Sequence, residues 1–237
     1  MSHNKRDQKA ILSAQLLLNL AEELKVPFLQ IARKAELHKT SIKDLNTIQV
    51  TAENALRLID GYALGLRMNL DDNITDFEPV SVSSVLYDAG QQLSSLANEY
   101  GVSLELSIAG RYGPVMANRE GLQAALVALG ASMIEAMPAQ GGRQLRLQLA
   151  THRSRYGIVA GLYGDNKKLS KDALQKGRKL KMTSRQPLLN VTHTSAAGIF
   201  VADALLSAMN LDLTSSRHQG MYGLGTVLQT NHQMQLV

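Results

Sequence analysis

Two neighbouring carboxylates, Glu22 and Glu23, lie in a polar notch of a leucine-rich stretch near the N-terminus. The stretch from Asn19 to Pro27 reads NLAEELKVP. A carboxylate can act as a nucleophile or as a general base when a reaction partner is presented to it. The same pair also fits two solvated residues on a helix face. Both interpretations stay open, an interaction role and a plain solvated surface.

A second candidate is the run of basic residues between Asp165 and Arg185. Eight lysines and arginines stand there against two aspartates, so this segment accounts for the formal net charge of +5. Clustered cations attract phosphate without reading a sequence, but the absence of aromatic side chains from the run argues against a single-strand binder. The alternatives are a solvated flexible loop and a patch for an acidic protein, a nucleotide-like ligand or nucleic acid. The cations singled out are Lys167, Lys168, Lys176, Arg178, Lys179 and Lys181.

The elements that position the carboxylate pair are two predicted helices, at about 8–37 and 41–68. Apolar residues recur on each at helical spacing, and Pro27 is expected to kink the first helix because it removes a backbone hydrogen bond. Two helices cannot enclose a core alone, so the stripes predict a dimeric four-helix bundle. Packing of the stripes on the rest of the chain is the alternative. The expected interface consists of Leu17, Leu20, Leu24, Ile31, Leu45, Ile48 and Ile59.

The acidic, proline-terminated stretch 69–79 is a plausible linker, and beyond it the pattern changes to mixed helices and strands. We expect helices at 85–100, 118–137 with Asn118 as its N-cap, and 198–209. Strands are expected at 80–82, 103–108, 114–117, 144–150, 157–163, 211–215 and 225–230, the last two joined by a GMYGLG turn. This mixture predicts an α+β fold with helices on one face of a mostly antiparallel sheet.

The composition excludes several classes of protein. There are no cysteines, so disulfides and thiolate metal sites are excluded, and the six histidines show no pairing at metal-ligand spacing. Apolar runs fall short of the roughly 20 residues that cross a bilayer, and the N-terminus does not resemble a signal peptide. We therefore expect a cytoplasmic protein without a membrane segment or a metal.

Five motifs in this order resemble those of the cytoplasmic core of bacterial sensor histidine kinases, over about residues 8–237. NLAEELKVP resembles the phosphoacceptor box SHELRTP, and NREGLQAALVALGASMIEAMP resembles the N-box helix. LYGDNKKLSKDAL is similar to the G1 stretch DNGPGISPEDL, SAAGIFVADALLSAMN to the G2 stretch and its helix, and GLGTVL to the closing glycine-threonine strand. The resemblance implies a dimerisation hairpin at 1–68, a linker at 69–79 and a GHKL-type ATP-binding domain at 80–237.

The residues that carry the family's chemistry are replaced. Glu22 stands where the family has its phosphoacceptor histidine, although the neighbouring acid is retained as Glu23. The nearest histidine, His38, lies roughly 24 Å further along the helix, too far to take its place. Asparagines that hold Mg²⁺ in the family fall at Ala128 and Ser132, and the adenine-binding aspartate falls at Gly164. Asp165 could serve only after a register shift that would reverse its face.

What remains of the nucleotide pocket is Gly198 of G2 and Thr226 of the closing strand, and close helix packing is the preferred role for Gly198. Gly220, Gly223 and Gly225 are expected to be turn residues rather than a phosphate cradle. The basic run occupies the place of the family's ATP lid. The sequence thus predicts no catalytic residue, no cofactor and a degenerate pocket.

The resemblance and its departures together predict a catalytically inactive, homodimeric signalling scaffold, with a response-regulator-like protein as its partner. Two alternatives stay open. One is an active kinase or ATPase that binds ATP and Mg²⁺ through unusual ligands such as Asp165 and Ser132. The other is a nucleic-acid-binding regulator that uses the basic run. The sequence does not name the partner, the input signal or the pathway.

Overall fold

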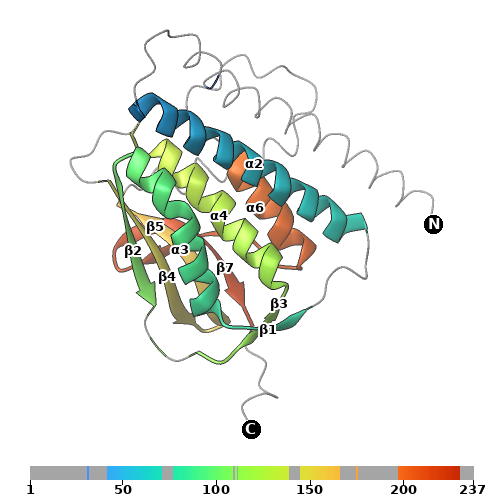
Figure 1. Cartoon of the computed structure of the whole chain (residues 1–237). Coiled ribbons are helices and arrows are strands. Elements are labelled where there is room, and N and C mark those ends of the chain that lie inside the picture. Colours follow the sequence, from blue (N-terminus) through green and yellow to red (C-terminus); the bar gives the residue numbers. More distant parts are fainter. Residues whose placement is uncertain are drawn as a thin grey trace.

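The computed structural model of the chain describes residues 42–70, 77–108, 110, 112–138, 145–165 and 197–229, with the single residues 31 and 175. These ranges hold four long helices and seven strands (Figure 1). The helices are α2 (Ile42–Leu70), α3 (Val82–Glu99), α4 (Arg119–Ala136) and α6 (Ala197–Ala208). The strands are β1 (Glu78–Val80), β2 (Val102–Ile108), β3 (Val115–Ala117), β4 (Leu145–Ser154), β5 (Gly157–Gly164), β6 (Thr214–His218) and β7 (Met221–Leu228).

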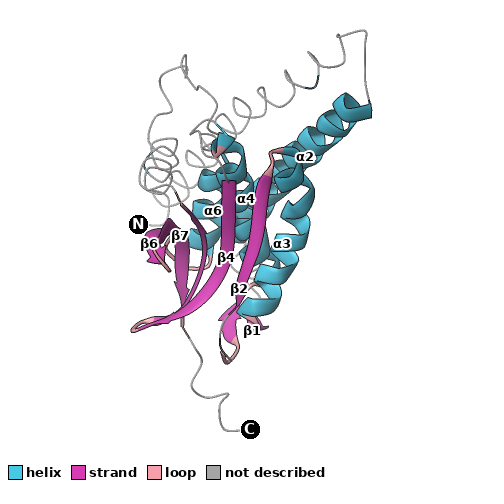
Figure 2. Cartoon of the chain, turned by 90° about the vertical axis from the view of Figure 1, so that its left-hand side faces the viewer, coloured by secondary structure: helices cyan, strands magenta, loops and turns pink. Residues whose placement is uncertain are grey.

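The predicted α+β fold is confirmed. Five strands form one sheet in the order β2-β4-β5-β7-β6, in which only the β2–β4 pair is parallel. Figure 2 shows the helices on one face of this sheet. β1 and β3 form a separate antiparallel ribbon. Because β4 and β5 are buried against the helix layer, they carry apolar side chains such as Leu147, Leu149 and Leu162 toward it.

Local sequence determines where most of these elements begin. Asn118 caps α4 as predicted, accepting a 2.7 Å hydrogen bond from the Gly121 N–H. Ser81 caps α3 in the same way, so the predicted strand at 80–82 instead ends at Val80. Such caps satisfy backbone donors that a helix leaves free in its first turn.

The last hairpin differs from the prediction. Its turn is Gln219–Gly220, with φ of 46° and 84°, and His218 pairs directly with Met221. Two successive positive φ values suit a two-residue hairpin turn. The GMYGLG stretch therefore lies mostly inside β7, and the interpretation of Gly223 and Gly225 as turn residues was wrong. Both are strand glycines at positions where β5 leaves no room for a side chain: a β-carbon on Gly223 would lie 1.8 Å from the Leu162 carbonyl oxygen, and one on Gly225 would lie 2.7 Å from the Ala160 carbonyl oxygen.

Helix α2 lies over α4 and α6, on the side of the helix layer away from the sheet (Figure 1). It contributes Leu58, Tyr62, Leu64 and Met68 to the same hydrophobic core as the sheet domain. Gly61 and Gly65 let it approach α6, because a β-carbon on Gly61 would already meet Val201 at 3.2 Å. One face of this helix is therefore packed within the chain.

The opposite face of α2 keeps the residues predicted for the dimer. Leu45 is 56% exposed and Ile48 and Ile59 are partly exposed, as is Ile31. Leu17, Leu20 and Leu24 lie outside the described residues. The four-helix bundle and the division at 1–68, 69–79 and 80–237 therefore stay predictions. None of the helices within the described ranges is both long and apolar enough to span a bilayer.

Candidate functional site

The structure brings together three of the predicted pocket residues, at the contact between α4 and α6. Ala128 and Ser132 are four residues apart and therefore lie on one face of α4. Gly198, in the first turn of α6, lies directly against them: a β-carbon on it would lie 2.2 Å from the Ala128 carbonyl oxygen and 2.5 Å from Ser132 Oγ. Ala128 and Ser132 are buried, at 6% and 2% exposure. Where the resemblance places Mg²⁺ ligands, the two helices touch.

Thr226 lies elsewhere, on the sheet surface that faces the helices. It pairs with Ala160 of β5, and Thr151 of β4 is the other cross-strand neighbour of Ala160. Both threonines are 1% exposed, and neither hydroxyl has a hydrogen-bond partner among the described residues. A buried hydroxyl without a partner costs about 1 to 3 kcal/mol. Sequence reasoning missed Thr151, because only the strand register places it across Ala160 from Thr226.

Asp165 faces away from the α4–α6 contact. Its neighbour Gly164 ends β5, and Asp165 itself forms a 3.2 Å ion pair with Arg146, which also lies 3.7 Å from Glu105. Alternation along β4 puts Arg146 opposite to the core-facing Leu147, so this ion-pair cluster lies on the outer sheet face. The hydrogen bond and charge of Asp165 raise the pKa of Arg146. The structure thus does not bring Asp165 to Ser132.

A cavity of about 690 Å³ lies between α2 and α4 and extends along the same α4 face to Ala128. Its volume is within the usual range for small-ligand sites. Its lining combines polar groups of mixed charge with apolar residues. The charged and amide groups are Asn54, Arg57, Asp60, Arg67, Glu78, Gln92, Asn118, Arg119, Glu120 and Gln123, and the apolar lining includes Leu58, Gly61, Leu64, Ala124 and Val127.

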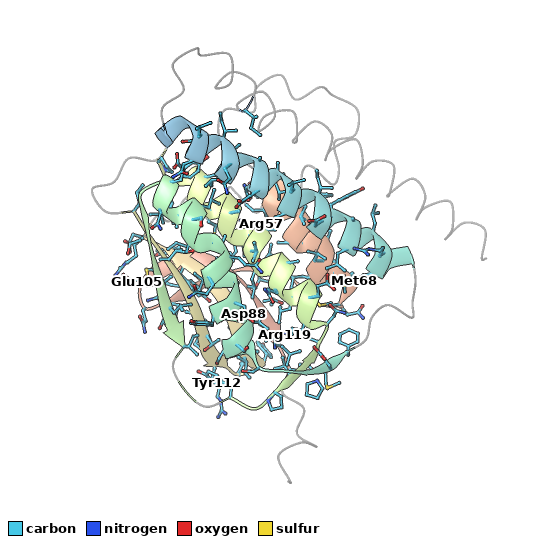
Figure 3. The ribbon with its side chains drawn as sticks, in the orientation of Figure 1. Arg57, Met68, Asp88, Glu105, Tyr112 and Arg119 are labelled. Carbon is cyan, nitrogen blue, oxygen red and sulfur yellow. The ribbon has the colours of Figure 1, made fainter. Side chains whose placement is uncertain are left out.

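Ion pairs and hydrogen bonds hold the walls of this cavity. Arg119 of α4 bonds to Asp88 of α3 at 2.7 Å, and Arg57 lies 3.5 Å from Glu53 on α2; Figure 3 labels Arg57, Asp88 and Arg119. Buried Asn54 donates a 2.5 Å hydrogen bond to Glu135 Oε1 and so ties α2 to α4. The cavity was not predicted, because it depends on where α2 packs. Among the described residues no group of histidines and carboxylates could hold a metal ion.

The remaining predicted site residues lie outside the described residues. These are Glu22 and Glu23, together with Lys167, Lys168, Lys176, Arg178, Lys179 and Lys181 of the basic run. Their roles stay predictions.

Solved structures of histidine kinases share the fold described above. No protein-family model matches the chain, and its sequence matches no curated protein. The histidine kinase AdeS of Acinetobacter baumannii has a similar structure, with a TM-score of 0.55, 12% identity, and coverage of 89% of this chain and 98% of that one. The resemblance predicted from the motifs is confirmed at the level of the fold.

Two further solved structures show the same likeness. Histidine kinase ThkA in complex with the response regulator TrrA gives a TM-score of 0.55 at 10% identity, over 96% of this chain and 65% of that one. Full-length ShkA in complex with AMPPNP gives 0.52 at 14% identity, over 95% of this chain and 46% of that one. The chain therefore corresponds to about half the length of ShkA.

Proposed function

We propose that this chain is a catalytically inactive histidine-kinase-like protein that acts in the cytoplasm as a homodimeric signalling scaffold. The histidine-kinase fold supports the general class. The proposal of inactivity starts from the residues that replace the family's phosphoacceptor and Mg²⁺ ligands, Glu22, Ala128 and Ser132.

The observation that carries the proposal is the contact of Gly198 with Ala128 and Ser132. Mg²⁺ takes six oxygen ligands in near-ideal octahedral geometry. A methyl group supplies no ligand, and the serine hydroxyl at the second position is buried beneath the first turn of α6. Leu58 and Gly61 of α2 line the cavity that reaches Ala128 along the adjoining α4 face, and this cavity does not open onto the buried Ser132 hydroxyl. A metal-bound nucleotide held at Ala128 and Ser132 would have to separate α4 from α6, which are in direct contact at Gly198.

The experiment that tests this is incubation of the full chain with MgATP labelled in the γ-phosphoryl group. We expect no label on the protein, since the chain has neither the acceptor histidine nor the asparagines. Label that is retained on the wild-type chain, and lost on Glu22→Gln, would instead establish a phosphorylated carboxylate and an active kinase.

For the partner we propose a response-regulator-like protein. ThkA was solved in complex with the response regulator TrrA, and that chain has the same fold. In the family the receiver domain docks on the hairpin beside the phosphoacceptor, so the corresponding region here surrounds Glu22 and Lys25. A complex that assembles without phosphotransfer would let such a scaffold sequester its partner.

For the dimer we propose that the exposed stripe of α2 is the interface. Leu45 and Leu56 are 56% and 57% exposed on α2, whose opposite face is packed within the chain. By light scattering we expect the 25.8 kDa chain to have about twice its monomer mass. Leu56→Lys should give monomers, while Tyr156→Lys, at a 64% exposed position on the β4–β5 turn, should not. A wild-type monomer, or equal behaviour of the two variants, would contradict this interface.

A further inference from the structure

Three aromatic side chains gather on the face of the sheet away from the helices. Leu147 and Leu149 of β4 point into the core, so by alternation His152 of β4 lies on the outer face. Cross-strand pairing places Tyr163 of β5 on this face too, opposite Gln148. Their rings lie 5.9 Å apart, and His218 of β6 contacts both.

The two imidazoles stack across the sheet. The ring centroids of His152 and His218 are 4.6 Å apart and the ring planes differ by 12°. Their strands, β4 and β6, are separated by β5 and β7 in the sheet order. Strands spaced about 4.8 Å apart would put them about 14 Å from each other in a flat sheet. The sheet therefore curls, and the histidine pair closes its concave face.

The stack covers a small second core. Tyr163 is fully buried and, with Ala150 and Met221, forms a cluster separate from the main core. Its ring lies over Gly161, where a β-carbon would meet the Tyr163 hydroxyl at 2.6 Å. That hydroxyl accepts a 2.9 Å hydrogen bond from Ser216 Oγ of β6. Glycine at this position thus makes room for the aromatic cluster.

The surroundings favour neutral imidazoles. Burial lowers the pKa of His152 from its usual 6.5, as does the nearby His218, and burial lowers the pKa of His218. His152 Nδ1 and His218 Nε2 are buried, and neither has a hydrogen-bond partner among the described residues. Neither of these buried nitrogens therefore has a described carboxylate bound to it that would offset a proton.

The other described charged groups on this face pair with one another and not with the two histidines. Arg146 of β4 forms ion pairs with Glu105 of β2 and with Asp165, the residue after β5. From β5 the titratable group is Tyr163. On β6 the neighbouring Arg217 alternates to the other face, where its guanidinium lies 5.0 Å from the Tyr222 ring. The described part of β7 adds only Met221, Gly223, Gly225 and Val227 to the outer face.

We propose that the His152–His218 stack is a pH-sensitive clasp, which holds β4 and β6 together while both rings are neutral and releases the concave face when they are protonated. Two imidazolium ions at this separation repel each other, and each loses hydration in its partly buried position. Release uncovers Tyr163 and Met221. In a signalling protein, such a clasp would respond to mild acidification as its input. It is a property of the sheet and does not depend on whether the chain binds nucleotide.

The sign of the pH dependence follows from the lowered pKa values. As pH falls below about 6.5, the unfolded chain binds protons that the folded protein excludes, so stability decreases until pH reaches the folded pKa values. Between pH 7.5 and 5.5 ordinary carboxylates, with pKa values near 4, change little. We expect the wild-type Tm to fall over this interval, and to fall less in the double variant His152→Gln, His218→Gln. Equal falls would overturn the clasp.

Nuclear magnetic resonance gives a second readout that does not require a stable double variant. In the wild-type protein both histidines are expected to titrate below pH 6.5. In His218→Gln the titration midpoint of His152 should rise, because a neighbouring positive charge is removed while burial remains. A wild-type midpoint at or above 6.5 for either ring, or an unchanged His152 midpoint in His218→Gln, would refute the proposal.

Discussion

Gly198→Ala is expected to destabilise the protein by about 2 to 3 kcal/mol. The added β-carbon would lie 2.2 Å from the Ala128 carbonyl oxygen, which belongs to the backbone of α4 and cannot rotate away. Helix α6 would have to move off α4, and both helices are central to the core. The loss should appear in urea unfolding as a lower midpoint with little change in slope.

Gly65→Ala is the matched control for this prediction. Like Gly198, it is a glycine at a contact between two helices. Its β-carbon, however, would lie 3.5 Å from Leu205 Cδ2, which is an ordinary contact with a side chain. Alanine favours a helix interior over glycine by up to about 1 kcal/mol, so this variant should be as stable as wild type or more stable. If both variants behaved alike, the direct α4–α6 contact would be refuted.

Gly223→Ala is expected to cost still more, over about 3 kcal/mol. A β-carbon at this position would lie 1.8 Å from the Leu162 carbonyl oxygen and 2.8 Å from the Tyr163 Cα. β7 lies between β5 and β6, so the clash would open the sheet rather than displace a flexible side chain. Thermal unfolding should show a large drop in Tm, or no folded protein should be recovered.

Gly220→Ala is the control in the adjacent turn. Nothing lies within 4 Å of a β-carbon there, but φ is 84°, so only the backbone preference of glycine is lost, at about 1 kcal/mol. If Gly220→Ala proved as damaging as Gly223→Ala, the glycines would matter for their turn conformation. The turn interpretation drawn from the sequence would then be reinstated.

Much of the fold could be predicted from the sequence because most elements carry local signals. Asn118 marks the start of α4, and the period-two pattern of residues 144–150, followed after a basic turn by the strand pattern of 157–163, predicts the β4–β5 hairpin. Local signals failed where tertiary contacts decide. The glycines of GMYGLG suit a turn, yet Gly223 is required by the approach of β7 to β5. The apolar stripe of α2 shows that a face is to be covered, but not that α4 and α6 cover one side of it.

The site was predictable only in part for the same reason. The motif order placed Ala128, Ser132 and Gly198 in one region, and the structure brings them into contact. The α2–α4 cavity has no sequence signal, because its walls come from four separate elements. Nor does the stack of His152 on His218, which are far apart in sequence and meet only because the sheet curls. The spacing of residues along the sequence does not show how strongly a sheet curls.

The inactivity proposed here is tested most directly by thermal unfolding of the full chain with and without millimolar MgATP, with Mg²⁺ alone as the control. A ligand that binds only the folded state, present at 100 times its Kd, stabilises it by about 2.7 kcal/mol. The direct contact of Gly198 with Ala128 and Ser132 predicts an unchanged Tm at every concentration. A Tm that rises with MgATP and then saturates would show that the pocket still forms, and would contradict the account.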